Sequence, residues 1–531
     1  MNIKNKPWLI IIFLILAFLT YMKIDYRFIE TFNCCQDDHD YLMHAETIAL
    51  DFDLDYSNQL KGFEEMRFNN DGKIAPKGFI GSGLLASPFL FVGNIFENIF
   101  EGGKNNTSAI FNFKILFYSL SAVFYFFVGI NLLTKVAYEL KIKIHPLSSL
   151  LIISGTGLIY YAFERYSMTH VYEFFTSALI IYLSHKYFST NLNYYALLIP
   201  ITMFLSLSVR WVNYFVVLLP FILYSLFKSS YKDLNLVRNQ YFIFSFFGSL
   251  IFFLYTNYVI YGKITFNPQF VYETEKMASG FLTGHNNFFH FLSDNISNLI
   301  TIFFTQEFGI ILFSPLIFFA SIYCVFLIFN NSLNISSKFI LVLSFALIYA
   351  PVLLWKSTAS SYGFRYLLSS VALCFILYSH YSKNYQNQTI SFLINFLSVF
   401  SVLSVLFFET SPETSLSLTE ATNSFGRELR FTQPNYLSGY LDSLFSFQSY
   451  LKIFSTSFLG ALIFKSILSF LSIDEFNSLL SKYNLPTNNE DFQNLLTNLD
   501  SISFSKILIF LLFLISVSLY IEKKLQRNEQ I

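Results

Sequence analysis

Long apolar stretches alternate with short polar connections along most of the chain. Trp8–Met22 and Tyr241–Tyr261, for example, approach or reach the roughly 17–25 residues that a helix needs to cross a bilayer. Because lipid offers no partner to free backbone groups, such stretches are predicted to be α-helices. The pattern predicts an all-α polytopic membrane protein with about twelve transmembrane helices. The expected spans are Trp8–Met22, Ala109–Leu133, Leu147–Phe163, Val171–Tyr187, Tyr194–Ser208, Val212–Phe227, Tyr241–Tyr261, Gly309–Phe329, Phe339–Trp355, Leu367–Tyr381, Ile390–Phe408 and Ile507–Ile521.

Composition agrees with this pattern. Of 531 residues, 54% are hydrophobic and 13% are charged, whereas about 25% are charged in a soluble domain. The net charge is zero, so a nucleic-acid partner is not implied. The four cysteines have no metal-ligand spacing.

The polar connections predict the topology. Lys4 and Lys6 precede the first apolar stretch, which is expected to be a retained signal anchor, and the positive-inside bias places them in the cytoplasm. Both termini are then cytoplasmic, and residues 23–84 form a long first outer loop. Leu84–Phe100 is expected to be re-entrant or interfacial because Pro88 interrupts it. The expected divisions are a transmembrane module over 1–408, a polar and mostly extracytoplasmic region over 409–505 with an interfacial helix near Ser455–Leu471, and a last span with a basic cytoplasmic tail over 506–531.

The first outer loop holds the densest carboxylate cluster near a membrane boundary. Asp37, Asp38 and Asp40 begin a predicted helix. Its apolar stripe consists of Tyr41, Leu42, Ala45, Ile48 and Ala49, and its polar side of Asp40, His44, Thr47 and Asp51. Two roles are open for Asp37 or Asp38. The residue either caps an interfacial helix, which stabilises the helix by about 0.5–2 kcal/mol, or takes part in catalysis.

Two arginines lie at the outer ends of predicted spans, where a charge is costly. Arg210 interrupts an apolar stretch, and Arg365 begins a span just after Gly363. Arg210 either snorkels to lipid head groups or binds a phosphate. Arg365 is suited to bind a phosphate because a guanidinium donates two parallel hydrogen bonds.

Further candidates occupy neighbouring outer turns. Glu164, Arg165 and His170 lie between two spans, and Glu307 lies at the mouth of another. His170 is either a solvated loop histidine or a ligand-binding group, and Glu307 either caps its own helix or pairs with an arginine. A carboxylate beside a bound hydroxyl acts as a general base, and nearby cations stabilise a departing phosphate. This combination fits group transfer from a lipid phosphate.

Several short motifs occur in a particular order. They are Asp37-Asp-His-Asp-Tyr-Leu42, Asp53-Leu-Asp-Tyr-Ser-Asn58, Val209-Arg-Trp-Val-Asn213, Phe308-Gly-Ile-Ile-Leu-Phe-Ser-Pro315 and Tyr362-Gly-Phe-Arg365. The set resembles the GT-C membrane glycosyltransferases, which use polyprenyl- or dolichyl-phosphate sugars, and within them uncharacterised bacterial members. Protein mannosyltransferases and lipid A aminoarabinose transferases belong to the same superfamily.

The resemblance implies an inverting glycosyltransferase of the bacterial plasma membrane that acts on its outer face. Asp37 would be the catalytic carboxylate, with Asp38 where Glu is usual. His39 and Asp40 replace the usual Pro-His. The residues expected to bind substrate are Tyr41, Arg165, His170, Arg210, Asn213, Glu307 and Arg365. The expected donor is a polyprenyl-phosphate sugar, and the acceptor is a lipid, glycan or protein.

No cofactor or obligatory metal is expected, although Asp37, Asp38 and Asp40 together offer oxygen ligands for a divalent cation. Two other functions remain open. A transporter or flippase of a lipid-linked saccharide would have ionisable residues along a path through the bilayer, and the central spans have few. An O-antigen polymerase or ligase would have a large arginine-rich outer loop, whereas 409–505 contains only Arg427 and Arg430.

Overall fold

The computed structural model describes residues 36–61, 73–76, 78–101, 113–232, 235–267, 299–330, 333–355, 362–408, 417–423, 426–432, 436–468 and 470–482, with single positions at 20, 508, 512, 515, 516 and 519. The predicted first span lies outside these residues except for position 20. The last span is represented only by the final five of these single positions.

The interior spans expected from the sequence coincide with helices. Within the part of the chain that the structure describes, five stretches are long and apolar enough to cross a membrane: Ile80–Phe100, Phe113–Glu139, Pro146–Phe163, Gln240–Tyr261 and Gln388–Phe407. Four shorter apolar stretches accompany them: Asn193–Val209, Trp211–Leu226, Pro315–Phe329 and Ile335–Pro351. Their length and composition support the predicted all-α, polytopic membrane architecture.

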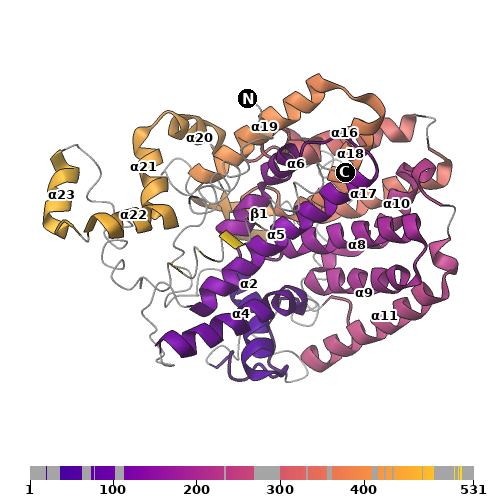
Figure 1. The fold of residues 1–531 in the computed structure, drawn as a ribbon, viewed down its shortest axis with the longest axis horizontal. Helices are drawn as coiled ribbons and strands as arrows, with labels where there is room; N and C mark the ends of the chain where they lie inside the picture. The colour runs from indigo at the N-terminus through magenta and orange to yellow at the C-terminus, as the bar shows by residue number, and fades with distance from the viewer. Residues whose placement is uncertain are drawn as a thin grey trace.

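Helix α8 (His170–Thr190) lies at the centre of the bundle. It packs between α5 (Phe113–Glu139) and α9 (Asn193–Val209), and α11 (Gln240–Tyr261) covers the other side of α9, as Figure 1 shows. Most residues of α8 are buried, whereas α11 exposes large side chains such as Phe244, which is 78% exposed. An interior helix can carry polar side chains that contact protein instead of lipid, which makes α8 suitable for charged groups.

The remaining helices complete the bundle. They are α10 (Leu219–Leu226), α15 (Ile310–Phe313), α16 (Pro315–Phe329), α17 (Ile335–Trp355), α18 (Val371–Tyr385) and α19 (Gln388–Phe407), with 3₁₀ turns η6 (Trp211–Leu218) and η9 (Arg365–Ser370).

Helix α4 (Ile80–Glu101) corrects the prediction of a short interrupted element at 84–100. It has 22 residues and continues through Pro88 without a break. Proline removes the hydrogen bond to the carbonyl one turn earlier, that of Leu84. The Ser87 hydroxyl donates to this carbonyl at 2.9 Å, so the helix loses no backbone partner where lipid could not supply one.

The span at 146–163 is broken in its second half. It consists of α6 (Pro146–Ile153), a π-helical turn η5 (Ser154–Leu158) and α7 (Ile159–Phe163), and Gly157 adopts φ 90°. A Cβ atom on Gly155 would lie 2.7 Å from Cα of Ser398, so only glycine allows α19 to approach this closely. Ser314 donates to the Thr156 carbonyl at 3.0 Å, which satisfies a group near the break.

The polar region after α19 contains the main departure from the predicted all-helical chain. Two antiparallel strands, β1 (Ser417–Asn423) and β2 (Gly426–Thr432), form a hairpin. The expected interfacial helix is divided between α21 (Phe447–Thr456) and α22 (Phe458–Leu468), because Ser457 caps a new helix by accepting from the Gly460 N–H at 3.0 Å. Helix α20 (Tyr436–Leu444) packs on α19, where the Tyr436 hydroxyl donates to the Ser404 carbonyl at 2.8 Å. Helix α23 (Ile473–Lys482) lies away from the bundle, at the left of Figure 1.

The bundle has two chemically different ends. One, the lysine-rich end, contains the helix ends around 139–146, 186–193, 226–239 and 383–388, and Glu139 there binds Lys186 at 2.6 Å. Contacts such as Lys383 Nζ to Ser230 Oγ at 2.9 Å join these segments. The other end contains α2 (Gln36–Glu46), the 164–169 turn and the start of η9.

Candidate functional site

Helix α2, with the π-helical turn η4 (Thr47–Asp51), positions the predicted carboxylates. It packs against α4 in Figure 1. The predicted apolar stripe is buried or half-buried, but three of the four residues expected on the polar side are buried too: Asp40 is 1% exposed, and His44 and Thr47 are 0% exposed. Asp51, the fourth, is exposed at the end of η4. Protein therefore surrounds this helix, in contrast to a helix lying on the membrane surface.

His44 explains part of this burial. Its Nε2–H donates to the Gly78 carbonyl at 2.9 Å, and its Nδ1 accepts from the Tyr56 hydroxyl at 2.7 Å. Tyr261 of α11 donates to the same Gly78 carbonyl at 2.7 Å. Burial lowers the pKa of His44 to about 4, so the imidazole is neutral at pH 7. The Asp53-Leu-Asp-Tyr56 motif thus holds α2 through Tyr56.

Asp38 joins α2 to the turn between α7 and α8. Its Oδ2 accepts from Nη2 of Arg165 at 3.0 Å and from Nε at 3.2 Å, and its Oδ1 accepts from the Ser167 hydroxyl at 2.5 Å. Both charged side chains are 5% exposed. Both arginine bonds end on the same carboxylate oxygen, and being charge-assisted they are stronger than bonds between neutral groups.

Asp37 lies one residue earlier in α2. Its backbone is helical, whereas its side chain lies outside the described part of the structure. The prediction that Asp37 is the reacting carboxylate stays a prediction.

A second group of charges lies at the start of α8. Glu173 Oε1 accepts from the Thr169 hydroxyl at 2.5 Å and lies 3.4 Å from Arg210 Nη1 and 3.3 Å from His170 Nδ1. His170 and Glu173 are fully buried, and the Arg210 side chain is 8% exposed. His170 is therefore not a solvated loop residue, and Arg210 does not snorkel to head groups.

Arg210 owes its position to the end of α9. The helix ends at Val209, and Arg210 takes an extended conformation with φ −166° and ψ 145° before η6 begins. This change of direction turns the guanidinium back towards α8. Asn213 supports the junction, since its Nδ2 donates to the Ser206 carbonyl at 2.9 Å.

Tyr366 brings the two predicted phosphate-binding arginines together. Cζ of Arg210 lies 4.5 Å from the Tyr366 ring centroid, and Cζ of Arg365 lies 5.5 Å from it. The two Cζ atoms are therefore at most about 10 Å apart, which is the sum of these distances.

Aromatic side chains enclose this group of charges. The Tyr161 ring packs edge-on against His170 at 4.4 Å, and its hydroxyl donates to the Tyr362 carbonyl at 2.8 Å. Phe308 lies 5.1 Å from Tyr362. The motif at 308–315 thus connects two parts of the bundle: its Phe308 packs on Tyr362, and its Ser314 hydroxyl donates to the Thr156 carbonyl in the broken span.

The structure thus brings most of the predicted site residues to one end of the bundle. The charged cluster is defined as Asp38, Arg165, His170, Glu173, Arg210 and Arg365. Tyr41, 6% exposed, packs beside Gly78, where an added Cβ atom would lie 2.8 Å from the ring. Glu307 is half-buried next to Phe308, and its backbone N–H donates to the Thr305 hydroxyl at 3.3 Å.

Three members of the site were not predicted. Glu173 lies within a predicted span, so the criterion of an ionisable residue at membrane depth could have identified it. Ser167 and Tyr366 carry no such signal, because serine and tyrosine are common throughout this chain.

Oxygen ligands for a divalent cation were considered for the three aspartates. Among the described residues, no group of three or more His, Cys, Asp or Glu side chains is arranged to hold a metal ion. The Asp37 side chain is not part of that set.

The geometry combines fixed charges with exclusion of water. Asp38 uses both oxygens to hold Arg165 and Ser167, which makes it a positioning group. The Arg210 side chain is 8% exposed, and electrostatic interactions in such a setting are stronger than in water, whereas Arg365 is half-buried.

No family model matches the chain, and no curated protein or solved structure shows significant similarity to it.

Proposed function

We propose that this protein is an inverting membrane glycosyltransferase that moves a sugar from a polyprenyl-phosphate donor to the hydroxyl of a lipid, glycan or protein acceptor. The observation that carries the proposal is the charged cluster. Its members come from α2, the α7–α8 turn, the start of α8, the α9–η6 junction and η9, which are separated by up to several hundred residues in the sequence. These segments contain the motifs that resemble GT-C enzymes.

The proposed reaction needs one base and a stabilised leaving group. The acceptor oxygen attacks the anomeric carbon, its proton passes to Asp37, and the bond between that carbon and the phosphate oxygen breaks. The electron pair leaves with the polyprenyl phosphate. Arg210 and Arg365 stabilise this phosphate by charge-assisted hydrogen bonds.

Asp38 has a different role in this scheme. Its ion pair with Arg165, at 3.0 Å, fixes the first turn of α2 against the bundle and thereby positions the backbone of the neighbouring Asp37. Asp38 is therefore a positioning residue, and Asp37 is the proposed catalytic residue.

The proposed orientation follows from the distribution of basic residues. Lys141, Lys143, Lys186, Lys232 and Lys383 belong to the lysine-rich end, away from the charged cluster. The positive-inside bias favours a cytoplasmic position for that end. The charged cluster then faces the outside of a bacterial plasma membrane, and both termini are cytoplasmic.

Reconstitution tests the proposal against transport. Purified protein in phosphatidylcholine vesicles is supplied with polyprenyl-phosphate sugars labelled in the sugar, together with a membrane lipid extract as acceptor. Formation of a labelled glycoside with release of polyprenyl phosphate supports the enzyme. Movement of the intact labelled lipid between leaflets without a new glycoside contradicts it and favours a flippase.

A further inference from the structure

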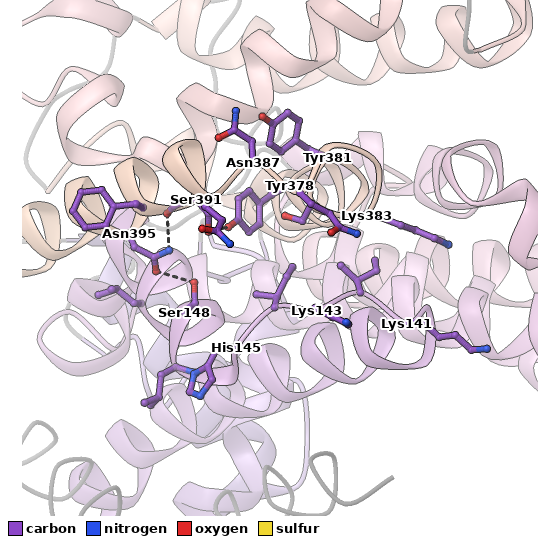
Figure 2. Close-up of a pocket in the computed structure, with 18 residues that line it drawn as sticks. Lys141, Lys143, His145, Ser148, Tyr378, Tyr381, Lys383, Asn387, Ser391 and Asn395 are labelled. Carbon is purple, nitrogen blue, oxygen red and sulfur yellow. Dashed lines mark hydrogen bonds between the residues drawn. The ribbon is translucent and has the colours of Figure 1, made fainter. Parts of the chain in front are cut away.

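A hollow of about 730 Å³ opens at the lysine-rich end. We call it the basic pocket. It is bordered by the connection between α5 and α6, the end of α18 and the start of α19, and Figure 2 shows its side chains. It lies at the opposite end of these helices from the charged cluster, so the proposed reaction does not use it.

The charged side chains that line this pocket are all basic. Lys141, Lys143 and Lys383 line it together with His145, and none of the described residues that line it is an aspartate or glutamate. The acid at the end of α5, Glu139, already binds Lys186 at 2.6 Å and His185 at 2.8 Å. The lysine charges of the basic pocket are therefore not neutralised by its own walls.

The polar groups of the wall are held in place. Ser148 Oγ donates to Asn395 Oδ1 at 2.7 Å, and Asn395 Nδ2 donates to the Ser391 carbonyl at 2.7 Å. The Tyr378 hydroxyl lies 2.9 Å from Ser391 Oγ. Figure 2 shows Ser148, Asn395 and Ser391 at one side of the hollow, whereas the side chains of Lys141 and Lys383 extend towards its other side. The network connects three helices, so the pocket is a built feature and more than a row of surface lysines.

One wall of the pocket continues onto a surface that is apolar. Phe392 lines the pocket and is 71% exposed. Phe396, one turn further along α19, is 60% exposed and stacks on it at 6.4 Å. Exposed phenylalanines on a candidate membrane span face lipid chains. A ligand with an anionic head and an apolar tail matches both parts.

We propose that the basic pocket binds the headgroup phosphate of an anionic phospholipid, whose acyl chain lies along Phe392 and Phe396. The lysines attract the phosphate, and the apolar strip on α19 accommodates the chain. A free phosphate ion would use the same lysines without the strip. This site is independent of the proposed enzyme reaction.

The test is a lipid titration of the full-length protein in mild detergent. Short-chain dioctanoyl phosphatidylglycerol, dioctanoyl phosphatidylcholine and inorganic phosphate are added separately, and native mass spectrometry counts the bound molecules. The test variant is Lys141→Gln with Lys143→Gln, and the control is Lys232→Gln with Lys338→Gln, two lysines of the same end that do not line the pocket. At about 1 kcal/mol for each lysine near a lipid phosphate, the test variant should bind phosphatidylglycerol about 30-fold more weakly.

The control should bind as the unchanged protein does, and phosphatidylcholine should bind much more weakly. Three results would overturn the proposal: equal binding of the two lipids, equal weakening in the control pair, or lysine-dependent binding of inorganic phosphate without such binding of phosphatidylglycerol. A second variant, Phe392→Ser with Phe396→Ser, should weaken lipid binding without changing phosphate binding.

Discussion

The buried pair of Asp38 and Arg165 gives the sharpest prediction for stability. The substitution Asp38→Asn removes a carboxylate that accepts two bonds from Arg165, at 3.0 and 3.2 Å, while both side chains are 5% exposed. Removing one partner of a buried ion pair costs about 3–5 kcal/mol, because the other charge stays buried without compensation. The asparagine still bonds Ser167, so we expect about 3 kcal/mol.

The pair is isolated by a double-mutant cycle. Arg165→Gln in the Asp38→Asn background removes the uncompensated charge, so the double variant should be more stable than the sum of the single losses by about 2 kcal/mol. Unfolding in sodium dodecyl sulfate, followed by tryptophan fluorescence, measures the free energy of unfolding. Trp211, next to Arg210, lies close to the charged cluster.

A matched control separates burial from loss of charge. Asp55 lies in the same loop, is exposed, and accepts only a local bond from the Ser57 N–H at 3.0 Å. Asp55→Asn should change the free energy of unfolding by less than about 0.5 kcal/mol. If Asp38→Asn behaved like this control, or if the two single losses were additive, the ion pair would not hold α2 against the bundle.

Three further predictions concern α2 and helix α4, which packs against it. Because the pKa of His44 falls to about 4, the stability that this neutral imidazole contributes is lost as pH falls from about 6.5 to 4, by about 3 kcal/mol. The measurement is the difference in unfolding free energy between the unchanged protein and His44→Asn, followed against pH. Burial raises the pKa of Glu46 to about 7, so Glu46 lowers the stability of both proteins as pH rises from 4.5 to 7, and the difference removes its contribution. A difference independent of pH would refute the assignment. Gly81→Ala places a Cβ atom 2.5 Å from the backbone of Ser208 and should lower stability by about 1–3 kcal/mol, and an unchanged unfolding midpoint would contradict the close approach of α4 and α9. Ser87→Ala leaves the Leu84 carbonyl without its hydroxyl donor and should lower the free energy of unfolding by about 1–3 kcal/mol. Ser466→Ala, on an exposed face of α22, should lower it by less than about 0.5 kcal/mol. Equal effects of the two substitutions would contradict this explanation of why α4 continues through Pro88.

Hydrophobic pattern was sufficient to predict the helices but not all their boundaries. The expected spans at 171–187 and 241–261 correspond to α8 and α11. Helix α4 was misjudged because the compensation for Pro88 comes from the side chain of Ser87, and a proline alone predicts a break. The hairpin of β1 and β2 was missed because its segments are polar and lack an apolar alternation.

The candidate site was predictable only where a charge stood out against an apolar background. Arg210 and Arg365 were identified in this way, and the structure brings both to Tyr366. Which carboxylate pairs with which cation depends on tertiary contacts: Asp38 and Arg165 are 127 positions apart. The burial of α2 on its polar side likewise depends on Tyr56 and Gly78, which no local pattern connects to His44.

The most direct test of the proposed function is turnover by Asp37→Asn in membranes that contain equal amounts of each protein. The assay measures polyprenyl phosphate released from a polyprenyl-phosphate sugar in the presence of acceptor lipid, with Asp55→Asn as the control. Loss of a general base lowers the rate by about 10²–10⁴-fold, so Asp37→Asn should fall by at least about 100-fold while the control keeps full activity. Full turnover by Asp37→Asn would contradict the assignment of that carboxylate as the base and, with it, the proposed mechanism.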